Sequence, residues 1–141
     1  MKSGPIVVVE DDVDDKEVLE DILRELNVKN KVIWFTKSNE AFQYLKTTLE
    51  QPFIIISDVN IPLENGIEFK RRIDNDPQLR QKSIPFVFYS TSIKKETVTE
   101  AYSEMTVQGF FKKGNSHSEI KKDVKLIVDY WMVCRHPNSK D

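Results

Sequence analysis

The feature that most constrains this chain is a short apolar run, Phe53-Ile54-Ile55-Ile56-Ser57, which follows Pro52 and stops at Asp58. A run of this length without alternation predicts a strand that is buried on both faces, as in the middle of a parallel sheet. In open α/β sheets, ligands bind outside the carboxyl ends of the strands. Asp58 is therefore expected at the mouth of a binding site.

Four more segments have the pattern of strands, and a helical pattern follows each of the five. The expected strands are residues 6–9, 31–36, 53–57, 85–90 and 109–111. Strict alternation predicts an α/β fold with a parallel sheet covered on both faces. The apolar first and third strands suit central positions, so we expect a doubly wound, flavodoxin-like sheet of five strands in the order 2-1-3-4-5. Ser38 is expected to cap the second helix, and the third should end near Asp76-Pro77.

The length and the charge balance narrow the class of protein. The 141 residues suit one domain spanning 1–141, with a core at about 5–133 and a short tail at 134–141. With 21 basic and 23 acidic residues, the chain has no broad electrostatic reason to bind nucleic acid or an anionic membrane. No segment approaches the roughly 20 apolar residues that span a bilayer, and the apolar stretch near the start is too short for a signal peptide. We therefore expect a cytoplasmic protein.

Polar residues stand at the carboxyl ends of four of the expected strands. They are Glu10-Asp11-Asp12, Asp58, Ser90-Thr91 and Lys112-Lys113. Strands 1 and 3 should be neighbours, so their acids converge, and carboxylates in one crevice repel each other unless a cation joins them. Oxygen ligands suit Mg²⁺. Carboxylate, magnesium, hydroxyl and lysine around one point predict a phosphoryl-transfer site, in which an aspartate can be the nucleophile.

Each of these features also has an ordinary structural explanation. Asp12, Asp14 and Asp15 suit the first turn of a helix, where the dipole favours negative charge, and capping is the better explanation of these three. A single acid, hydroxyl or lysine pair at a strand end is unremarkable by itself. Their joint placement at four strand ends carries the prediction of a site.

The same motifs resemble the receiver domain of two-component response regulators, from about Ile6 to the final helix. The matching segments are Val9-Glu10-Asp11-Asp12, the run from Asp58 to Gly66, Tyr89-Ser90-Thr91 and Gly109-Phe110-Phe111-Lys112-Lys113. The resemblance implies that the phospho-acceptor is Asp58, the acidic pair Glu10 and Asp11, the hydroxyl Ser90 and the essential lysine Lys113. Gly114 and Phe110 depart from the family, which usually has proline after the lysine, with a cis bond, and often has tyrosine as the switch aromatic.

The resemblance also implies a metal site and a signalling route. We expect Mg²⁺ to be bound by Asp11, Asp58 and the backbone carbonyl of Asn60, with Glu10 acting through water. Ser90 and Phe110 would form the switch. They would carry the signal to the surface of the last two helices and the fifth strand, which offers Tyr102, Lys121 and Lys122 to a partner.

The implied function is a phosphorelay switch in a stand-alone receiver. It would accept a phosphoryl group on Asp58 from a sensor histidine kinase or phosphotransfer protein and change its binding to a downstream protein target or to a second copy of the chain. It would catalyse only its own magnesium-dependent phosphorylation and dephosphorylation, through Asp58, Ser90 and Lys113.

Three other functions fit the sequence less well. An unphosphorylated interaction module is disfavoured because all the site residues are present. A phosphohydrolase would need a second acid beside the nucleophile, which Asp58-Val59-Asn60 lacks. A flavin site would need a glycine- and hydroxyl-rich loop where Glu10-Asp11-Asp12 stands.

Overall fold

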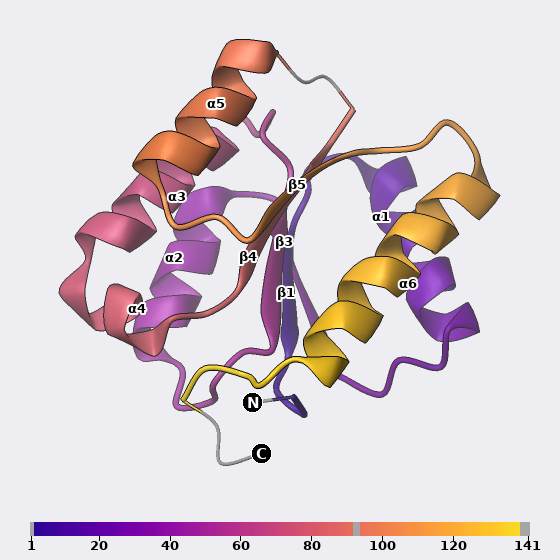
Figure 1. The fold of residues 1–141 in the computed structure, drawn as a ribbon, viewed down its shortest axis with the longest axis horizontal. Coiled ribbons are helices and arrows are strands. Elements are labelled where there is room, and N and C mark those ends of the chain that lie inside the picture. Colours follow the sequence, from indigo (N-terminus) through magenta and orange to yellow (C-terminus); the bar gives the residue numbers. More distant parts are fainter. Residues whose placement is uncertain (1, 92–93, 139–141) are drawn as a thin grey trace.

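The computed structural model describes residues 2–91 and 94–138, which form an α/β fold around one five-stranded parallel sheet (Figure 1). The strands are β1 (Ile6–Val9), β2 (Val32–Phe35), β3 (Ile54–Ser57), β4 (Phe86–Ser90) and β5 (Gly109–Lys112). Their order is β2-β1-β3-β4-β5, as predicted. All residues of β1, β3 and β4 are buried, whereas β2 is half-buried. The continuous apolar runs therefore correctly marked strands inside the sheet.

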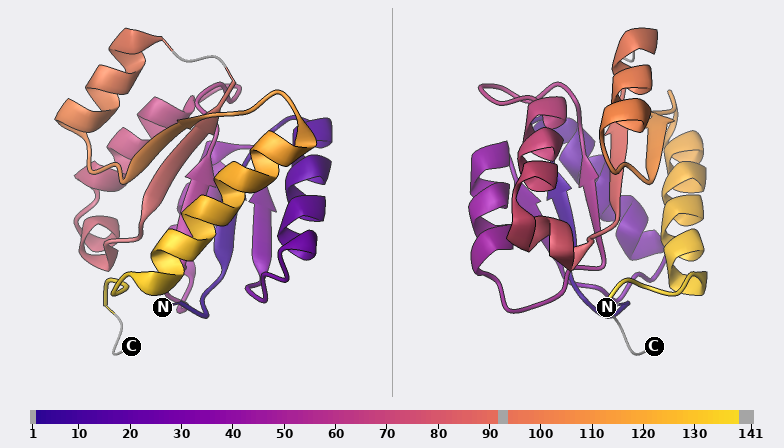
Figure 2. Two further views of the ribbon diagram at one scale, coloured as in Figure 1. Left: turned by 45° about the vertical axis from the view of Figure 1, so that its right-hand side comes forward. Right: turned by 60° about the vertical axis from the view of Figure 1, so that its left-hand side comes forward.

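Helices cover both faces of the sheet. They are α1 (Val13–Glu25), α2 (Ser38–Thr47), α3 (Gly66–Asn75), α4 (Pro77–Lys82), α5 (Lys95–Glu104) and α6 (His117–Val133). Figures 1 and 2 show α1 and α6 on one face and α2 to α5 on the other. Because side chains alternate along a strand, Val7 and Ile55 pack with α2 and α3, whereas Val8 and Ile56 pack with α1 and α6. The core is thus two apolar layers, one on each side of the sheet.

The helix count differs from the prediction, since the described residues contain six helices where the sequence predicted five. The additional helix is α4, which begins at the Asp76-Pro77 pair that ends α3. The Asp76 side chain accepts a hydrogen bond from the backbone N–H of Leu79 at 3.0 Å and so caps α4. Proline is tolerated in the first helical turn, where its missing N–H has no helical partner. Burial of Leu79 anchors this helix on the core.

The starts of α1 and α2 show how the helices follow their strands. Asp12 caps α1, and its side chain accepts from the backbone N–H of Asp15 at 3.0 Å, as the capping explanation predicted. The prediction that Ser38 caps α2 is wrong. Lys37 is the cap residue, and the Ser38 hydroxyl donates to the backbone carbonyl of Glu64, 2.9 Å away. Ser38 therefore ties α2 to the loop that follows β3.

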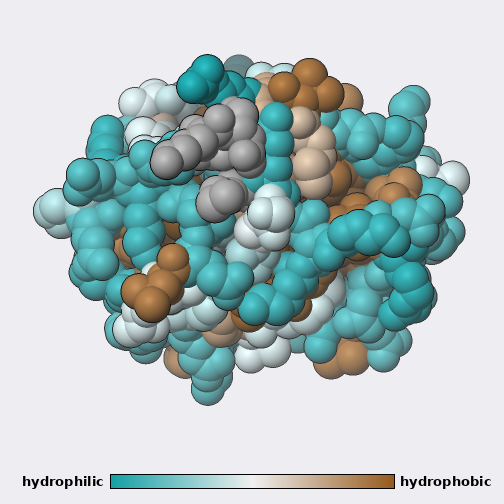
Figure 3. Space-filling model, turned by 90° about the horizontal axis from the view of Figure 1, so that it is seen from below, coloured by the Kyte–Doolittle hydropathy of each residue, from teal (hydrophilic) through white to brown (hydrophobic). Residues whose placement is uncertain are grey.

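The residues after α6 pack under the sheet, near the amino ends of the strands (Figure 2). The ring of His136 stacks on Phe53, and its Nε2 lies 2.6 Å from the Phe53 carbonyl oxygen. Asn138 donates to the carbonyl of Lys82 at 2.7 Å. The expected tail at 134–141 is thus docked as far as Asn138, and its last three residues lie outside the described ones. Seen from this end, the surface is mostly hydrophilic (Figure 3).

Candidate functional site

The carboxyl ends of β1 and β3 bring two acids to the same edge of the sheet. The register pairs Val9 with Ser57, so Glu10 and Asp58 are the next residues along the two strands. The backbone N–H of Asp58 donates to the carbonyl of Val9 at 3.0 Å, which continues the ladder by one bond. Asp58 is therefore held by the sheet itself, although it lies one residue beyond β3.

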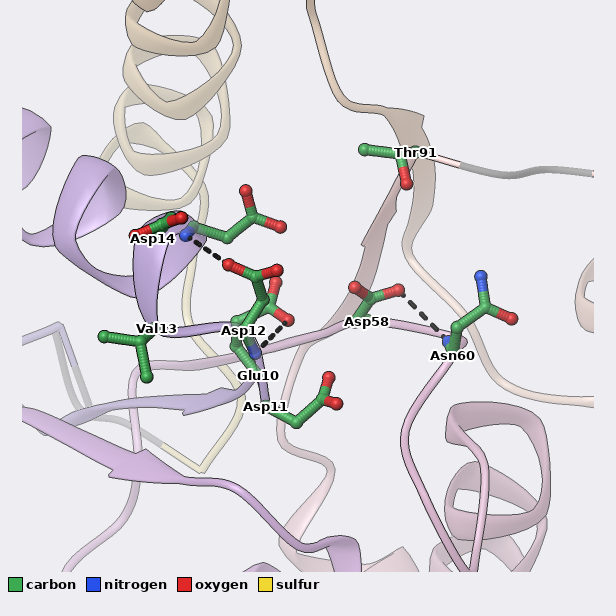
Figure 4. Close-up of a pocket in the computed structure, with 9 residues that line it drawn as sticks. Glu10, Asp11, Asp12, Val13, Asp14, Asp58, Asn60 and Thr91 are labelled. Carbon is green, nitrogen blue, oxygen red and sulfur yellow. Dashed lines mark hydrogen bonds between the residues drawn. The ribbon is translucent and has the colours of Figure 1, made fainter.

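One oxygen of the Asp58 carboxylate is fixed by two donors, and the side chain lies at the wall of an open pocket (Figure 4). Its Oδ1 accepts a 2.7 Å hydrogen bond from the hydroxyl of Ser90 and a 3.1 Å bond from the backbone N–H of Asn60. Ser90 ends β4 and is 0% exposed. The carboxylate is thus oriented by the neighbouring strand and by its own loop, with little freedom to turn.

Lys113 joins the site from the end of β5. Its side chain is 9% exposed, and its Nζ lies 3.3 Å from Oδ2 of Asp58 and 3.2 Å from Oδ2 of Asp15, and also contacts Glu10. The preceding lysine, Lys112, is exposed. Of the two lysines, Lys113 is therefore the one that reaches the acids of the pocket, and it is the lysine that the resemblance implied.

Glu10 and Lys113 shift each other's pKa values. Burial raises the pKa of Glu10 to about 7, while the hydrogen bond and the charge of Lys113 act in the opposite direction. Burial also disfavours the charged form of Lys113, but its contact with Glu10 and the charges of Glu10, Asp58 and Asp15 outweigh this and raise its pKa. Lys113 is therefore a cation at neutral pH, and it offsets the charge of the acids around it.

Asp11 and Asn60 are exposed at the mouth of the same pocket, which has a volume of about 470 Å³. Within the described residues, no three acidic, histidine or cysteine side chains are grouped closely enough to hold a metal ion as they stand. The donor chemistry nevertheless fits a hard divalent cation, because Asp11, Asp58 and the backbone of Asn60 supply only oxygen. The exposed side chain of Asp11 lines the same pocket as Asp58.

The tight loop after β3 explains why the segment from Asp58 to Gly66 ends in glycine. The backbone N–H of Gly66 donates to the carbonyl of Val59 at 2.8 Å, which closes the loop tightly. A β-carbon at Gly66 would lie 2.2 Å from the carbonyl oxygen of Asp58 and 3.0 Å from the ring of Phe88. The loop that follows Asp58 therefore requires glycine at this position, because backbone atoms occupy the space that a side chain needs.

The expected switch residues lie along β4 and β5. The ring of Phe110 is half-buried and packs against Phe88 with centroids 5.1 Å apart. The backbone N–H of Phe110 donates to the hydroxyl of Tyr102 at 2.9 Å, so α5 is tied to β5 through that side chain. No peptide bond in the described part of the chain is cis, so the bond between Lys113 and Gly114 is trans.

Sequence reasoning missed one member of the site. Asp15 was assigned only to the first turn of α1, yet its carboxylate contacts Lys113 across 98 residues of sequence. The spacing contained a partial signal, because a helix that begins directly after β1 keeps its first turn near the strand ends. The partner of Asp15 became visible only when β5 was placed in the sheet.

A doubly wound parallel sheet with an acidic pocket, a buried hydroxyl and a lysine at its carboxyl edge defines the class of receiver-type proteins. Residues 6–125 match the family model of the response regulator receiver domain, and the chain belongs to this family. Membership implies a role in two-component phosphorelay signalling, as a switch rather than an enzyme with a separate substrate.

Similar proteins support this assignment. The chain is 26% identical over 132 residues to the response regulator Rcp1 of Synechocystis sp. (strain ATCC 27184 / PCC 6803 / Kazusa), covering 90% of this chain and 88% of Rcp1. The phosphorylated cyanobacterial phytochrome response regulator RcpA has the same fold, with a TM-score of 0.85, 28% identity and coverage of 95% of this chain and 98% of RcpA. The Mn²⁺-bound structure of Rcp1 aligns with a TM-score of 0.81 and 24% identity over 96% of this chain and 99% of Rcp1. None of the helices described here is long and apolar enough to cross a membrane.

Proposed function

We propose that this chain is a phosphorelay switch whose Asp58 accepts a phosphoryl group from a sensor histidine kinase or a phosphotransfer protein. The observation that carries the proposal is the convergence on one carboxylate of the Ser90 hydroxyl, 2.7 Å away, and the Lys113 ammonium, 3.3 Å away. A hydroxyl and a cation on the two oxygens of one acid are the donors that a phosphoryl group needs. Such a relay places the protein in the cytoplasm.

The transfer is a substitution at phosphorus. An oxygen of the Asp58 carboxylate forms a bond to phosphorus while the bond from phosphorus to the donor's leaving atom breaks, and the leaving group keeps the electron pair. Lys113 offsets the charge that the phosphoryl oxygens bring into the pocket, and Ser90 donates a hydrogen bond to one of them. Hydrolysis of the acyl phosphate by water returns the carboxylate and releases inorganic phosphate.

A divalent cation completes the proposed site. Asp11, Asp58 and the backbone carbonyl of Asn60 would hold Mg²⁺, with Glu10 acting through a water molecule, and the Mn²⁺-bound form of Rcp1 is a precedent for a divalent metal in this fold. A bound metal ion would neutralise charge at the phosphoryl oxygens.

The proposed signal runs from Ser90 to Phe110. When the Ser90 hydroxyl follows the phosphoryl group, the space beside Phe88 changes, and the half-buried ring of Phe110 turns inward. The hydrogen bond from Phe110 to Tyr102 couples this movement to α5. The surface of α5, β5 and α6, including Lys121 and Lys122, would then change its affinity for a downstream protein or a second copy of the chain.

The test is the intact mass after incubation with phosphoramidate and Mg²⁺. We expect wild-type protein to gain the mass of one phosphoryl group and to lose it on standing. Asp58→Asn keeps the shape of the side chain and removes the nucleophile, so this variant should gain nothing. Asp21→Asn, at an exposed acid of α1 outside the pocket, serves as the control and should gain the group normally. Equal labelling of wild type and Asp58→Asn would contradict the proposal.

A further inference from the structure

The ammonium of Lys113 has a third acidic partner that the proposed chemistry does not use. In addition to Glu10 and Asp58, its Nζ lies 3.2 Å from Oδ2 of Asp15. The side chains of Glu10 and Asp58 are 6% and 10% exposed, whereas that of Asp15 is 43% exposed. Asp15 therefore approaches the lysine from the solvent side of the pocket.

The position of Asp15 is set by the start of α1. Asp12 accepts a hydrogen bond from the backbone N–H of Asp15, which fixes the first turn of the helix directly after β1. Asp14 belongs to the same turn and lines the same pocket, but within the described chain it has no ion pair. Two neighbouring acids of one helical turn thus differ in their contact with Lys113.

The three acidic partners of Lys113 already match the number of hydrogens on its ammonium. A lysine has three N–H donors, and Glu10, Asp15 and Asp58 supply three acceptors for them. A phosphoryl group on Asp58 adds further oxygens and negative charge beside Lys113, so one acceptor must be released when the lysine turns to them. Asp15 is the partner whose release costs least, because its exposed carboxylate can return to water.

We propose that Asp15 is a positioning residue that competes with the incoming phosphoryl group for Lys113 and thereby slows phosphorylation of Asp58. This inference rests on the proposed function of Asp58. The carboxylate of Asp15 holds part of the lysine's charge toward solvent, and the transfer proceeds as that contact opens. Removing the charge of Asp15 leaves more of the lysine's charge for the phosphoryl oxygens, which favours the transition state over the resting site.

The kinetic test compares Asp15→Asn with the matched control Asp14→Asn, each of which removes one negative charge from the same turn of α1. With phosphoramidate and Mg²⁺, we expect Asp15→Asn to raise the initial rate of phosphoryl gain about two- to fivefold, the range for a partly exposed ion pair. Asp14→Asn should change the initial rate by no more than about a third as much. Asp15→Glu restores a carboxylate within reach of Lys113 and should return the rate toward that of wild type.

A second measurement, on metal-free and unphosphorylated protein, tests the contact itself. In ¹H–¹⁵N spectra of the lysine side chains, the Lys113 signal is assigned by its loss in Lys113→Met. It should shift in Asp15→Asn and stay in place in Asp14→Asn. An altered rate without this shift would overturn the inference, because Asp15 would then act through the general field of the pocket.

The outcomes separate this inference from the proposed function. If wild-type protein takes no phosphoryl group, the proposed function fails and the role of Asp15 fails with it. If wild type is phosphorylated and Asp15→Asn reacts at the rate of Asp14→Asn, the inference about Asp15 alone is overturned.

Discussion

The hydroxyl of Ser90 donates a 2.7 Å hydrogen bond to Oδ1 of Asp58, while the ammonium of Lys113 lies 3.3 Å from Oδ2 of the same carboxylate. Each oxygen of Asp58 therefore already has a partner that comes from a different strand end. A phosphoryl group cannot be attached to either oxygen without changing at least one of these contacts. This arrangement joins the Asp58 carboxylate to the carboxyl ends of β4 and β5.

Replacing Ser90 with alanine should uncouple phosphorylation from the response. We expect Ser90→Ala to gain the phosphoryl group about tenfold more slowly, because a hydrogen bond to a charged group is lost. Chemical shifts around Phe110 and Tyr102 should change less on phosphorylation than in wild type. Thr47→Ala removes a hydroxyl that bonds only within α2 and serves as the control. A full response in Ser90→Ala would remove Ser90 from the signalling route.

The two adjacent lysines provide a matched test of the buried cation. Lys113→Met leaves Glu10 and Asp58 without their cation, and the free energy of unfolding in urea at pH 8 should fall by on the order of 3 kcal/mol. Lys112→Met changes an exposed side chain and should alter it by less than about 0.5 kcal/mol. Equal effects of the two substitutions would show that burial of the ammonium does not govern stability here.

Magnesium should stabilise the folded protein through Asp11. A ligand that binds only the folded state adds about 2.7 kcal/mol at one hundred times its dissociation constant, so the Tm should rise with the Mg²⁺ concentration. Asp11→Ala should abolish this rise, whereas Asp14→Ala, at an acid outside the proposed ligand set, should preserve it. Calorimetry with and without a chelator provides the measurement. An undiminished rise in Asp11→Ala would remove Asp11 from the proposed ligands.

Alanine at Gly66 should disrupt the loop that carries Asp58. The added β-carbon would lie 2.2 Å from the backbone oxygen of Asp58, which cannot move without shifting the loop, so we expect a loss of about 3 kcal/mol or more in unfolding free energy. In Gly109→Ala the neighbouring atom is 2.9 Å away on the ring of Phe111, a side chain that can turn. That variant should lose about 1 kcal/mol. A reversed order of the two losses would contradict the close approach at Gly66.

The buried His136 should make stability depend on pH. Burial lowers the pKa of His136 below its ordinary 6.5, although the carbonyl oxygens of Phe53 and Pro137 act in the opposite direction. The unfolded chain therefore takes up the proton more readily, so the stabilisation is present above pH 6.5 and is lost as the pH falls below it.

The measurement is the unfolding free energy of wild type minus that of His136→Gln between pH 5 and pH 8. This difference should be largest above pH 6.5 and should shrink toward pH 5. The other histidine of the chain, His117, is exposed and lies 2.7 Å from Glu25, so the corresponding difference for His117→Gln should not shrink toward pH 5. A difference that does not vary with pH would show that His136 contributes only its packing on Phe53.

The sequence by itself determined the order of strands in the sheet and most of the residues that meet at its carboxyl edge. Continuous apolar runs such as 53–57 indicated burial on both faces, and strict alternation with helical patterns indicated a parallel sheet. Since the carboxyl ends of parallel strands meet at one edge, Asp58, Ser90 and Lys113 could be placed together before any coordinate was known. These features are local or follow from topology, and for this reason one sequence was sufficient.

The tertiary structure alone decided which side chains meet. Asp15 contacts Lys113, Ser38 binds the loop at Glu64, and His136 docks on Phe53, although nothing local distinguishes these residues from ordinary cap, surface or tail positions. Such contacts depend on the distance and angle between elements that are far apart in the chain. Those quantities are set by how the two apolar layers pack against the sheet, and the pattern of apolar residues along the sequence does not contain them.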